Sequence, residues 1–343
     1  MLKINELDKK TFIIAEVGPN HNGSIKKAKK IIDLLSSSDI DCVKFQLGNP
    51  DKIFSKNSFK ANYQKFFLKK LSIKQISEKN QLSRADHIIL SKYCKKKKLI
   101  YGCSAFDLES LKFLDKKIKI PFFKIPSGEV FSLDMLKYIS KKKKPIFIST
   151  GMASINQLKK ILKIITKFGN KKIVIMHCVS SYPAAKNTLN LNIINLLKQK
   201  FRYRVGYSDH SIGEEACLAS VAKNVNVIEK HITLSKKLIG PDHKTSMEIK
   251  NFKRLVEKVR NLEKILGKKE KKFSKEEMNV QKSSRKSIVS ARIIKKKNKI
   301  NLNDLCFKRP GTGINPLNIN EVVGKKAKKN IKENIIIRKE FFY

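Results

Sequence analysis

Two lysines of this sequence lie between apolar residues, where a charged side chain is unusual. Lys44 and Lys124 each have an apolar neighbour on both sides. Burying an unpaired ammonium group is energetically costly, so each lysine needs an anionic partner. A small ligand that carries both a phosphate and a carboxylate would supply one. The alternative is a structural network in which the lysines pair with the chain's own Glu16, Glu129 or Glu229.

Four serines stand at or just after the ends of similar apolar runs. They are Ser104, Ser127, Ser149 and Ser208. Serine hydroxyls and nearby backbone amides bind phosphate and carboxylate oxygens, so these residues would complement the two lysines. Ser127-Gly128 and Ser149-Thr150-Gly151 are also compatible with ordinary strand-to-helix turns in which serine caps the helix.

Two histidines, His210 and His231, each follow or end an apolar run. If the two runs are neighbouring strands, the imidazoles can meet over one metal ion. Two histidines with carboxylates and waters suit a divalent ion such as Mn²⁺. An isolated histidine is more often a hydrogen-bonded core residue, so the sequence leaves both interpretations open.

These residues belong to a regular alternation of apolar runs and amphipathic stretches. The runs predict strands, and each run is followed by a stretch with helical periodicity. The predicted strands are Phe12–Val17, Cys42–Leu47, Leu99–Cys103, Phe122–Ile125, Pro145–Ser149, Ile173–Cys178, Tyr203–Tyr207 and Asn226–His231. Eight β-then-α units predict a (β/α)₈ TIM barrel. A doubly wound sheet is the alternative, but the Gly-rich first turn typical of that fold is missing.

Each predicted strand has an apolar body and a polar end. In (β/α)₈ barrels, catalytic groups collect at the carboxyl ends of the strands. A purely structural barrel does not need polar residues at all of these positions. The pattern therefore predicts an active site at this end of the barrel.

The sequence changes character beyond the predicted barrel. We expect a catalytic domain over residues 1–266, a Lys- and Glu-rich linker over 267–284, and a small β-rich domain over 285–343. Within the barrel, the stretch Gly48–Leu82 is too long for an ordinary connection between a strand and its helix. We expect this stretch to cover the top of the barrel.

The chain carries a formal net charge of +47, with 76 Lys and Arg against 29 Asp and Glu. Basic chains often bind nucleic acid or anionic membranes. Here the excess is mostly Lys, it is spread along the chain, and no aromatic residues interleave with it. We interpret the charge as composition bias on solvated surfaces and expect no nucleic-acid partner. A positive field would still attract an anionic substrate.

Several features predict a cytoplasmic protein without a membrane partner. No apolar stretch approaches the roughly 20 residues that span a bilayer. The first residues, Met1–Lys10, contain no apolar signal segment. The six cysteines form no C-x-x-C pair, which is typical of reduced thiols in the cytoplasm.

Seven motifs occur in order along the predicted barrel. They are Ile14–Gly23, Val43–Gln46, Lys124–Glu129, Ser149–Met152, Gly206–His210, Glu229–His231 and Gly240–His243. Together they resemble the N-acetylneuraminate (sialic acid) synthase family, which includes legionaminate and pseudaminate synthases. The run Lys308–Gly311 resembles the antifreeze-like (SAF) domain that follows the barrel in this family.

The resemblance implies a role for each matching residue. Phosphoenolpyruvate would be held by Lys44, Ser104, Lys124, Ser127, Ser149 and Ser208, and a divalent ion, Mn²⁺ before Mg²⁺ or Co²⁺, by His210 and His231. Gln46, Tyr182 and Asp242 would contact the sugar or support the metal, and Glu16 and Glu129 would act as acid and base beside the catalytic lysines. Ser104 stands where threonine is common, but a hydroxyl is kept.

The resemblance also implies a reaction and an assembly. The first expectation is the condensation of phosphoenolpyruvate with N-acetylmannosamine and water to N-acetylneuraminate and phosphate, with cleavage of a C–O bond. The alternative is a legionaminate synthase acting on a diacetamido-trideoxyhexose; Asp242–Ser246 makes a pseudaminate synthase the weaker option. A domain-swapped homodimer is expected, in which Arg309 reaches the partner's active site and binds the acyl group of the sugar.

Two functions of other classes remain as alternatives. A Schiff-base pyruvate aldolase needs a lysine that faces the substrate carbonyl, but the sixth predicted strand ends in His177 and Cys178 instead. A Lys-rich nucleic-acid-binding protein would explain the charge but not the polar strand ends.

Overall fold

The computed structural model describes residues 2–61 and 71–343, and the chain divides into two compact units after Gly267. The first unit holds the predicted barrel and the second holds the predicted small domain. Each unit has its own apolar core. We describe them separately.

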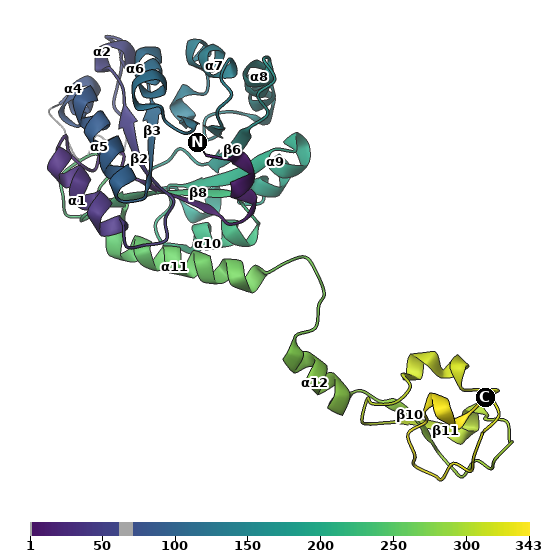
Figure 1. Cartoon of the computed structure of the whole chain (residues 1–343). Helices are drawn as coiled ribbons and strands as arrows, with labels where there is room; N and C mark the ends of the chain where they lie inside the picture. Colours follow the sequence, from purple (N-terminus) through teal and green to yellow (C-terminus); the bar gives the residue numbers. More distant parts are fainter. Residues whose placement is uncertain (1, 62–70) are drawn as a thin grey trace. The chain divides into compact units, whose positions relative to one another are not determined.

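The first unit is a closed barrel of parallel strands (Figure 1). Its strands are β1 (Phe12–Glu16), β2 (Cys42–Leu47), β3 (Ile100–Ala105), β4 (Phe123–Ile125), β5 (Ile146–Ser149), β6 (Ile173–Cys178), β7 (Arg204–Asp209) and β8 (Val227–Thr233). Each strand pairs with its sequence neighbours, and β1 pairs with β8 to close the sheet. The short strand β9 (Met247–Glu248) adds to β8. The predicted (β/α)₈ fold is confirmed, and β3 and β7 run past their predicted ends.

Helices on the outside connect the strands. They are α1 (Ile25–Leu35), α5 (Arg84–Lys96), α6 (Leu108–Phe113), α7 (Leu133–Ser140), α8 (Ile155–Thr166), α9 (Ile193–Phe201), α10 (Glu215–Ala222) and α11 (Ile249–Leu266). Helix α1 shows how the sequence determines where a helix begins and which face it buries. The hydroxyl of Ser24 accepts a hydrogen bond from the amide of Lys27 and so caps the helix. The apolar face of α1 includes Ile31 and Leu35, which are fully buried against the sheet.

The interior of the barrel is apolar toward the amino ends of its strands. Phe122 and Phe147 stack there with ring centroids 4.5 Å apart, and Phe12 meets both rings edge-on. Leu2 and Leu7 of the amino-terminal segment pack against this cluster. This end of the barrel is thus filled by side chains, which leaves the carboxyl ends of the strands for the chemistry.

The long stretch between β2 and α5 contains two short helices, α2 (Pro50–Ile53) and α4 (Ile73–Lys79). The two helices contact each other at the carboxyl end of the barrel (Figure 1). Residues 62–70, which belong to the stretch expected to cover the barrel, lie outside the described residues.

The second unit begins within the predicted linker. Helix α12 (Lys275–Ser284) occupies part of residues 267–284. Strands β10 (Ser287–Ser290) and β11 (Leu305–Lys308) then form a small antiparallel sheet. A core of mainly β-branched residues, including Ile288, Ile300 and Ile337, holds the unit together.

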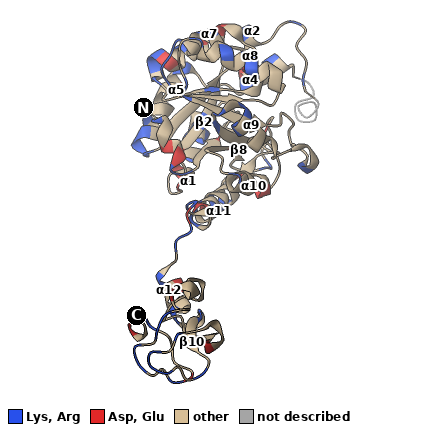
Figure 2. Cartoon of the chain, turned by 90° about the vertical axis from the view of Figure 1, so that its right-hand side faces the viewer, with Lys and Arg blue, Asp and Glu red and all other residues tan. Residues whose placement is uncertain are grey.

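Figure 2 shows lysine and arginine residues both on the barrel helices and in the second unit. Both units therefore contribute to the positive charge. A search of the described residues finds no helix long and apolar enough to cross a membrane.

Candidate active site

Four charged side chains meet inside the carboxyl end of the barrel. Lys44 Nζ lies 2.7 Å from Glu16 Oε2 and 3.7 Å from Glu229 Oε2, and Lys124 Nζ lies 3.1 Å from Glu229 Oε1. All four residues are at most 3% exposed. The register of the parallel sheet brings them together, because Glu16 on β1 is level with Lys44 on β2. We call these four residues the ion cluster.

The two carboxyl groups of the ion cluster have opposite electrostatic environments. Burial opposes the ionisation of Glu229, but Lys124 and Lys44 together outweigh it and lower its pKa to about 2. Burial dominates at Glu16, and with only Lys44 opposing it strongly, the pKa of Glu16 rises to about 7. Burial would lower the pKa of Lys44, but Glu16 and Glu229 raise it above its usual value. The cluster therefore holds one firmly ionised carboxylate and one carboxyl group that titrates near neutral pH.

Two of the four predicted serines contact the ion cluster. Lys44 Nζ donates to Ser104 Oγ at 3.0 Å, and Ser208 Oγ donates to Glu229 Oε1 at 3.0 Å. Ser127 Oγ accepts from the amide of Gly151 at 3.1 Å. The hydroxyl of Ser149, at the end of β5, is buried without a hydrogen-bond partner among the described residues. A buried hydroxyl without a partner is suited to a ligand.

His210 and His231 lie next to each other, with ring centroids 5.3 Å apart. His210 Nδ1 is 2.8 Å from the carbonyl oxygen of Val179, which assigns a proton to Nδ1 and leaves the Nε2 lone pair available. That Nε2 is 3.0 Å from the hydroxyl of Tyr182, whose ring packs on His210. Burial, with His210 nearby, keeps the pKa of His231 well below its usual value, so His231 is neutral. A neutral imidazole is the form that binds metals. At His210, burial would lower the pKa, but Cys178 and the carbonyl of Val179 raise it above its usual value.

The donor atoms around the histidines fit a partly open metal site. His231 Nδ1 is buried, has no hydrogen-bond partner in the described part of the chain, and lies 3.5 Å from Asp242 Oδ2. Burial raises the pKa of Asp242 to about 6. Within residues 2–61 and 71–343, no three His, Cys, Asp or Glu side chains are arranged as a complete metal site. The protein thus offers two imidazoles and a nearby carboxyl group, with positions left for ligands from solution.

A cavity of about 260 Å³ opens beside His231. Gln46, Tyr182 and Asp242, to which the resemblance assigns a contact with the sugar or the metal, border it. Gln46 Nε2 donates to Glu16 Oε1 at 2.8 Å, which links the cavity to the ion cluster. A ligand in this cavity would therefore lie next to His231 and within one side chain of Glu16.

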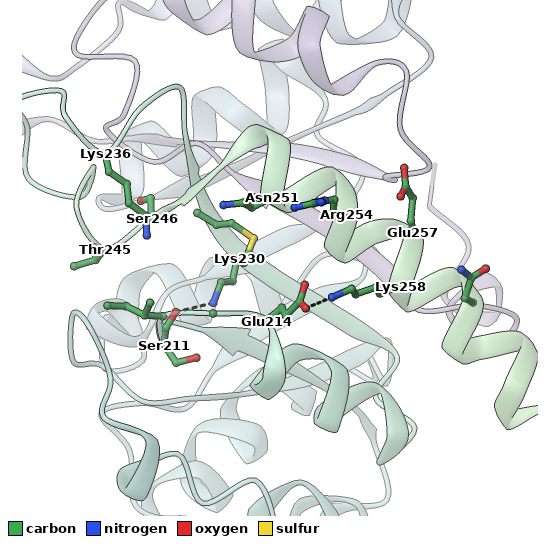
Figure 3. A pocket seen from close by; sticks show the side chains of 14 residues that line it. Ser211, Glu214, Lys230, Lys236, Thr245, Ser246, Asn251, Arg254, Glu257 and Lys258 are labelled. Carbon is green, nitrogen blue, oxygen red and sulfur yellow. Dashed lines mark hydrogen bonds and ion pairs between the residues drawn. The ribbon is translucent and has the colours of Figure 1, made fainter.

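A second cavity, of about 610 Å³, lies on the outer side of β7 and β8 (Figure 3). It is bordered by α11 and by Lys230, whose ammonium group donates to Asp209 Oδ2 at 2.5 Å and to the carbonyl of Ser211 at 2.6 Å. Although this cavity is larger, no residue of the ion cluster and neither histidine lines it. We therefore place the chemistry at the smaller cavity.

Of the remaining predicted site residues, Glu129 lies outside the ion cluster and Arg309 belongs to the second unit. The carboxylate of Glu129 accepts a hydrogen bond from Ser132 and lines a different cavity, so it does not join the ion cluster. Arg309 belongs to the second unit and is exposed there. Glu229 takes the position beside Glu16 that the sequence analysis gave to Glu129. The signal for Glu229 was its spacing from His231, because alternate residues of a strand face the same side.

Comparisons with known proteins identify the family. Residues 31–271 match the NeuB family, and residues 285–342 match the SAF domain. The chain is 41% identical to an N,N'-diacetyllegionaminic acid synthase of Campylobacter jejuni, over 96% of this chain and 99% of that protein. It is 36% identical to an N,N'-diacetyllegionaminic acid synthase of Legionella pneumophila, over 93% of this chain and 91% of that protein.

A solved structure agrees with these relatives. The crystal structure of an N-acetylneuraminic acid (sialic acid) synthetase from Leptospira borgpetersenii has a TM-score of 0.72 and 29% sequence identity to this chain. The alignment covers 79% of this chain and 90% of that one. The resemblance seen in the sequence motifs is therefore confirmed, and this chain belongs to the NeuB family of synthases and carries a carboxyl-terminal SAF domain.

Proposed function

We propose that this chain condenses phosphoenolpyruvate with a 2,4-diacetamido-2,4,6-trideoxyhexose and water, giving N,N'-diacetyllegionaminate and phosphate. The observation that carries the proposal is the ion cluster beside two adjacent imidazoles at the carboxyl end of the barrel. This arrangement suits a small dianion next to an electrophile. The choice of sugar rests on the two legionaminic acid synthases to which the chain is similar. N-acetylmannosamine, the sugar expected first from the motifs, is less well supported.

Lys44 and Lys124 neutralise the phosphate and the carboxylate of phosphoenolpyruvate in this proposal. Their present partners are glutamates, from which the two ammonium groups would turn toward the bound anion. The hydroxyls of Ser104, Ser127, Ser149 and Ser208 supply hydrogen bonds to the same anion. Neutralising the anion allows its enol carbon to approach the carbonyl carbon of the sugar.

The bond changes follow from the chemistry of an enol phosphate. The enol carbon attacks the aldehyde carbon of the open-chain sugar, and the aldehyde oxygen takes a proton to become a hydroxyl. The former enol carbon that bears the phosphate becomes cationic, water adds to it, and the water loses a proton. The bond from this carbon to the bridging oxygen then breaks, the new hydroxyl gives its proton to the leaving phosphate, and a ketone remains.

Glu16 and Glu229 have different roles at the cationic carbon. Glu229 stays ionised and stabilises the positive charge. Glu16, with a pKa near 7, accepts the proton of the attacking water. Glu129 was expected to be the second acid/base carboxylate, but we assign its part to Glu229 because Glu129 lies outside the ion cluster.

His210 and His231 would hold a divalent ion, Mn²⁺ before Mg²⁺ or Co²⁺, with Asp242 beside them. When bound, such an ion would act as a Lewis acid toward the sugar aldehyde. Titration of the chelator-treated protein with Mn²⁺ should show one site per chain by direct metal analysis. His231→Ala should lose it, and a variant that keeps full metal occupancy would contradict the assignment.

The decisive test of the reaction is a product analysis. The protein is incubated with phosphoenolpyruvate and a panel of N-acylated mannosamine-type and diacetamido sugars, and each product is identified by mass. With ¹⁸O at the bridging oxygen of phosphoenolpyruvate, the label should leave in phosphate. Label retained in the sugar acid would mean P–O cleavage and would refute the mechanism.

The assembly is a separate part of the proposal. We infer a cytoplasmic homodimer in which the SAF domain of one chain completes the site of the other and Arg309 contacts an acyl group of the sugar; this rests on the family resemblance. Mixing Arg309→Ala protein with Glu16→Gln protein should restore part of the activity through hybrid dimers. An absence of recovery, with subunit exchange verified by mass, would exclude action in trans.

A further inference from the structure

The cavity beside His231 has two unlike walls. The wall nearest the ion cluster is polar and contains Gln46, Tyr182, His231 and Asp242. The other wall is apolar and contains Ile53, Phe54, Ile73, Ile76 and Phe106. We call this second group the apolar wall. It is not part of any motif that identifies the family.

Most of the apolar wall is formed by the stretch between β2 and α5, and Phe106 follows β3. Ile73 and Ile76 are three residues apart on α4, so they share one face of the helix, and Ile76 is 4% exposed. Ile53 ends α2, which contacts α4 (Figure 1). A Cβ atom at Gly48 would come within 2.5 Å of Ile53 Cδ1 and 3.0 Å of Phe106 Cβ. Gly48 thus allows Ile53 to pack closely onto the end of the strand.

The polar groups beside the apolar wall are uncharged. Ser77, Asn80 and Gln81 border the cavity, and none of its described lining residues is a lysine or an arginine. Gln81 Nε2 donates to Ser77 Oγ at 3.3 Å. Gln81 Oε1 is a buried acceptor without a partner among the described residues. Such an acceptor suits the N–H of a ligand amide.

The length of the open-chain sugar determines which of its ends can contact the apolar wall. The aldehyde carbon must lie near His231 and Glu16, where the polar wall meets the ion cluster. An open-chain hexose places its last carbon about 6 Å from its first, at the roughly 1.2 Å per bond of an extended chain. The far end of the sugar therefore lies across the cavity from the reacting carbon.

We propose that the apolar wall binds the far end of the sugar and selects a methyl group over a hydroxymethyl or phosphorylated group at C6. The inference rests on the proposed function and adds the part of the protein that sets its substrate preference. A hydroxyl at C6 would lose its water without gaining a partner on the apolar wall. A phosphate at C6 would find no cation among the described lining residues. The acetamido group at C4 has Gln81 Oε1 as a nearby acceptor.

The first test needs only the unaltered protein and two matched sugars. N-acetylmannosamine and its 6-deoxy analogue differ only in the hydroxyl at C6. We expect kcat/KM to be roughly 10- to 100-fold higher for the 6-deoxy sugar, mainly through KM. Equal values, or a preference for the hydroxyl, would overturn the inference.

The second test alters the apolar wall. Ile53→Thr with Ile73→Thr replaces the ethyl branch of each side chain by a smaller, polar hydroxyl. This double variant should reduce the preference for the 6-deoxy sugar at least about tenfold and leave KM for phosphoenolpyruvate unchanged. Ile88→Thr is the matched control, because Ile88 lies on α5 away from the cavity and is 37% exposed. An unchanged preference in the folded double variant would overturn the inference.

The outcomes separate the inference from the proposed function. If no sugar of the panel reacts with phosphoenolpyruvate, the proposed function itself is wrong. If diacetamido sugars react but C6 makes no difference, only the role of the apolar wall is wrong. Should the double variant not fold, the comparison of the two sugars on the unaltered protein decides alone.

Discussion

Strand β8 carries buried charged residues on both of its faces, and the two faces differ in how completely those charges are paired. Inside the barrel, Glu229 pairs with Lys124 and Lys44. On the outside, Lys230 pairs with Asp209. Glu229 and Lys230 are adjacent in sequence and are both at most 3% exposed. Burial of charge therefore does not distinguish the two faces.

The outer pair is fully satisfied. Asp209 Oδ1 accepts from Tyr207 Oη at 3.0 Å and from the amide and the hydroxyl of Ser211 at 2.9 and 2.7 Å. Burial would raise the pKa of Asp209, but Lys230 and these hydrogen bonds outweigh it and lower the pKa. The inner group instead leaves Ser149 Oγ and His231 Nδ1 without partners in the described structure. It also holds one glutamate whose pKa is raised.

The completeness of hydrogen bonding distinguishes a structural ion pair from a binding site. A structural pair uses its hydrogen-bonding capacity within the protein. A binding site leaves some donors and acceptors unpaired within the protein, where a ligand can bind them. It can also contain an ionisable group whose pKa is shifted from its usual value.

The largest effect is expected for Glu16→Gln. The amide keeps the shape of the side chain but cannot accept a proton, so kcat should fall by up to about 10⁴-fold. Phosphoenolpyruvate should still bind, because Lys44 and Lys124 remain, and calorimetry should show an affinity within a few-fold of the unaltered protein. Loss of binding together with turnover would mean that Glu16 supports the anion site rather than the chemistry.

Lys230→Met should chiefly affect stability. It leaves the Asp209 carboxylate buried without its ammonium partner, which costs about 3–5 kcal/mol of unfolding free energy. Urea unfolding of this variant and of the unaltered protein gives the difference. If the folded variant loses phosphoenolpyruvate binding while keeping its stability, the outer pair is not structural and the comparison fails.

Lys44→Met should chiefly affect ligand binding. Hydrogen bonds to charged groups contribute roughly 1.5–3 kcal/mol, so the Kd for phosphoenolpyruvate should rise about 10- to 100-fold. Removal of Lys44 also removes the main opposition to the raised pKa of Glu16. Isothermal titration above pH 8 measures the affinity, and an unchanged Kd would assign Lys44 to structure alone.

The smallest effect is a pH dependence. Burial raises the pKa of Glu16 to about 7, and the proposed base must be deprotonated to work. The value of kcat/KM should therefore be highest above pH 7 and fall up to tenfold for each pH unit below it. In the small residual activity of Glu16→Gln, this dependence should disappear. A profile that stays flat from pH 6 to pH 8 in the unaltered protein would contradict the role of Glu16 as the base.

The barrel was predictable from the sequence because its strands are short apolar runs and its helices are amphipathic. The polar strand ends also indicated Lys44, Lys124 and the two histidines. The carboxylate partner of Lys124 is harder to predict from the sequence. Glu129 follows a predicted strand and Glu229 lies in one, and only the closed sheet determines which of them contacts Lys124. The Lys- and Glu-rich composition of residues 267–284 predicts a linker, although Ser274 and Glu277 form a capping box that signals the start of α12.

The apolar wall could not be predicted at all. Ile53 and Ile76 come from the stretch between β2 and α5, whereas Phe106 follows β3, and the local sequence pattern of neither segment indicates a shared cavity. Their convergence depends on how the stretch between β2 and α5 folds back over the barrel. Sequence periodicity describes single elements and carries no information on such long-range contacts.

The location of the apolar wall has a consequence for how such enzymes diversify. The reacting groups belong to strands that are tied together by the closed sheet, whereas Ile53, Ile73 and Ile76 belong to a connecting stretch outside it. Mutations in that stretch can accumulate without altering the register of a strand. A gene library restricted to codons 48–61 and 71–82 should therefore yield synthases with new sugar ranges from one unchanged catalytic apparatus.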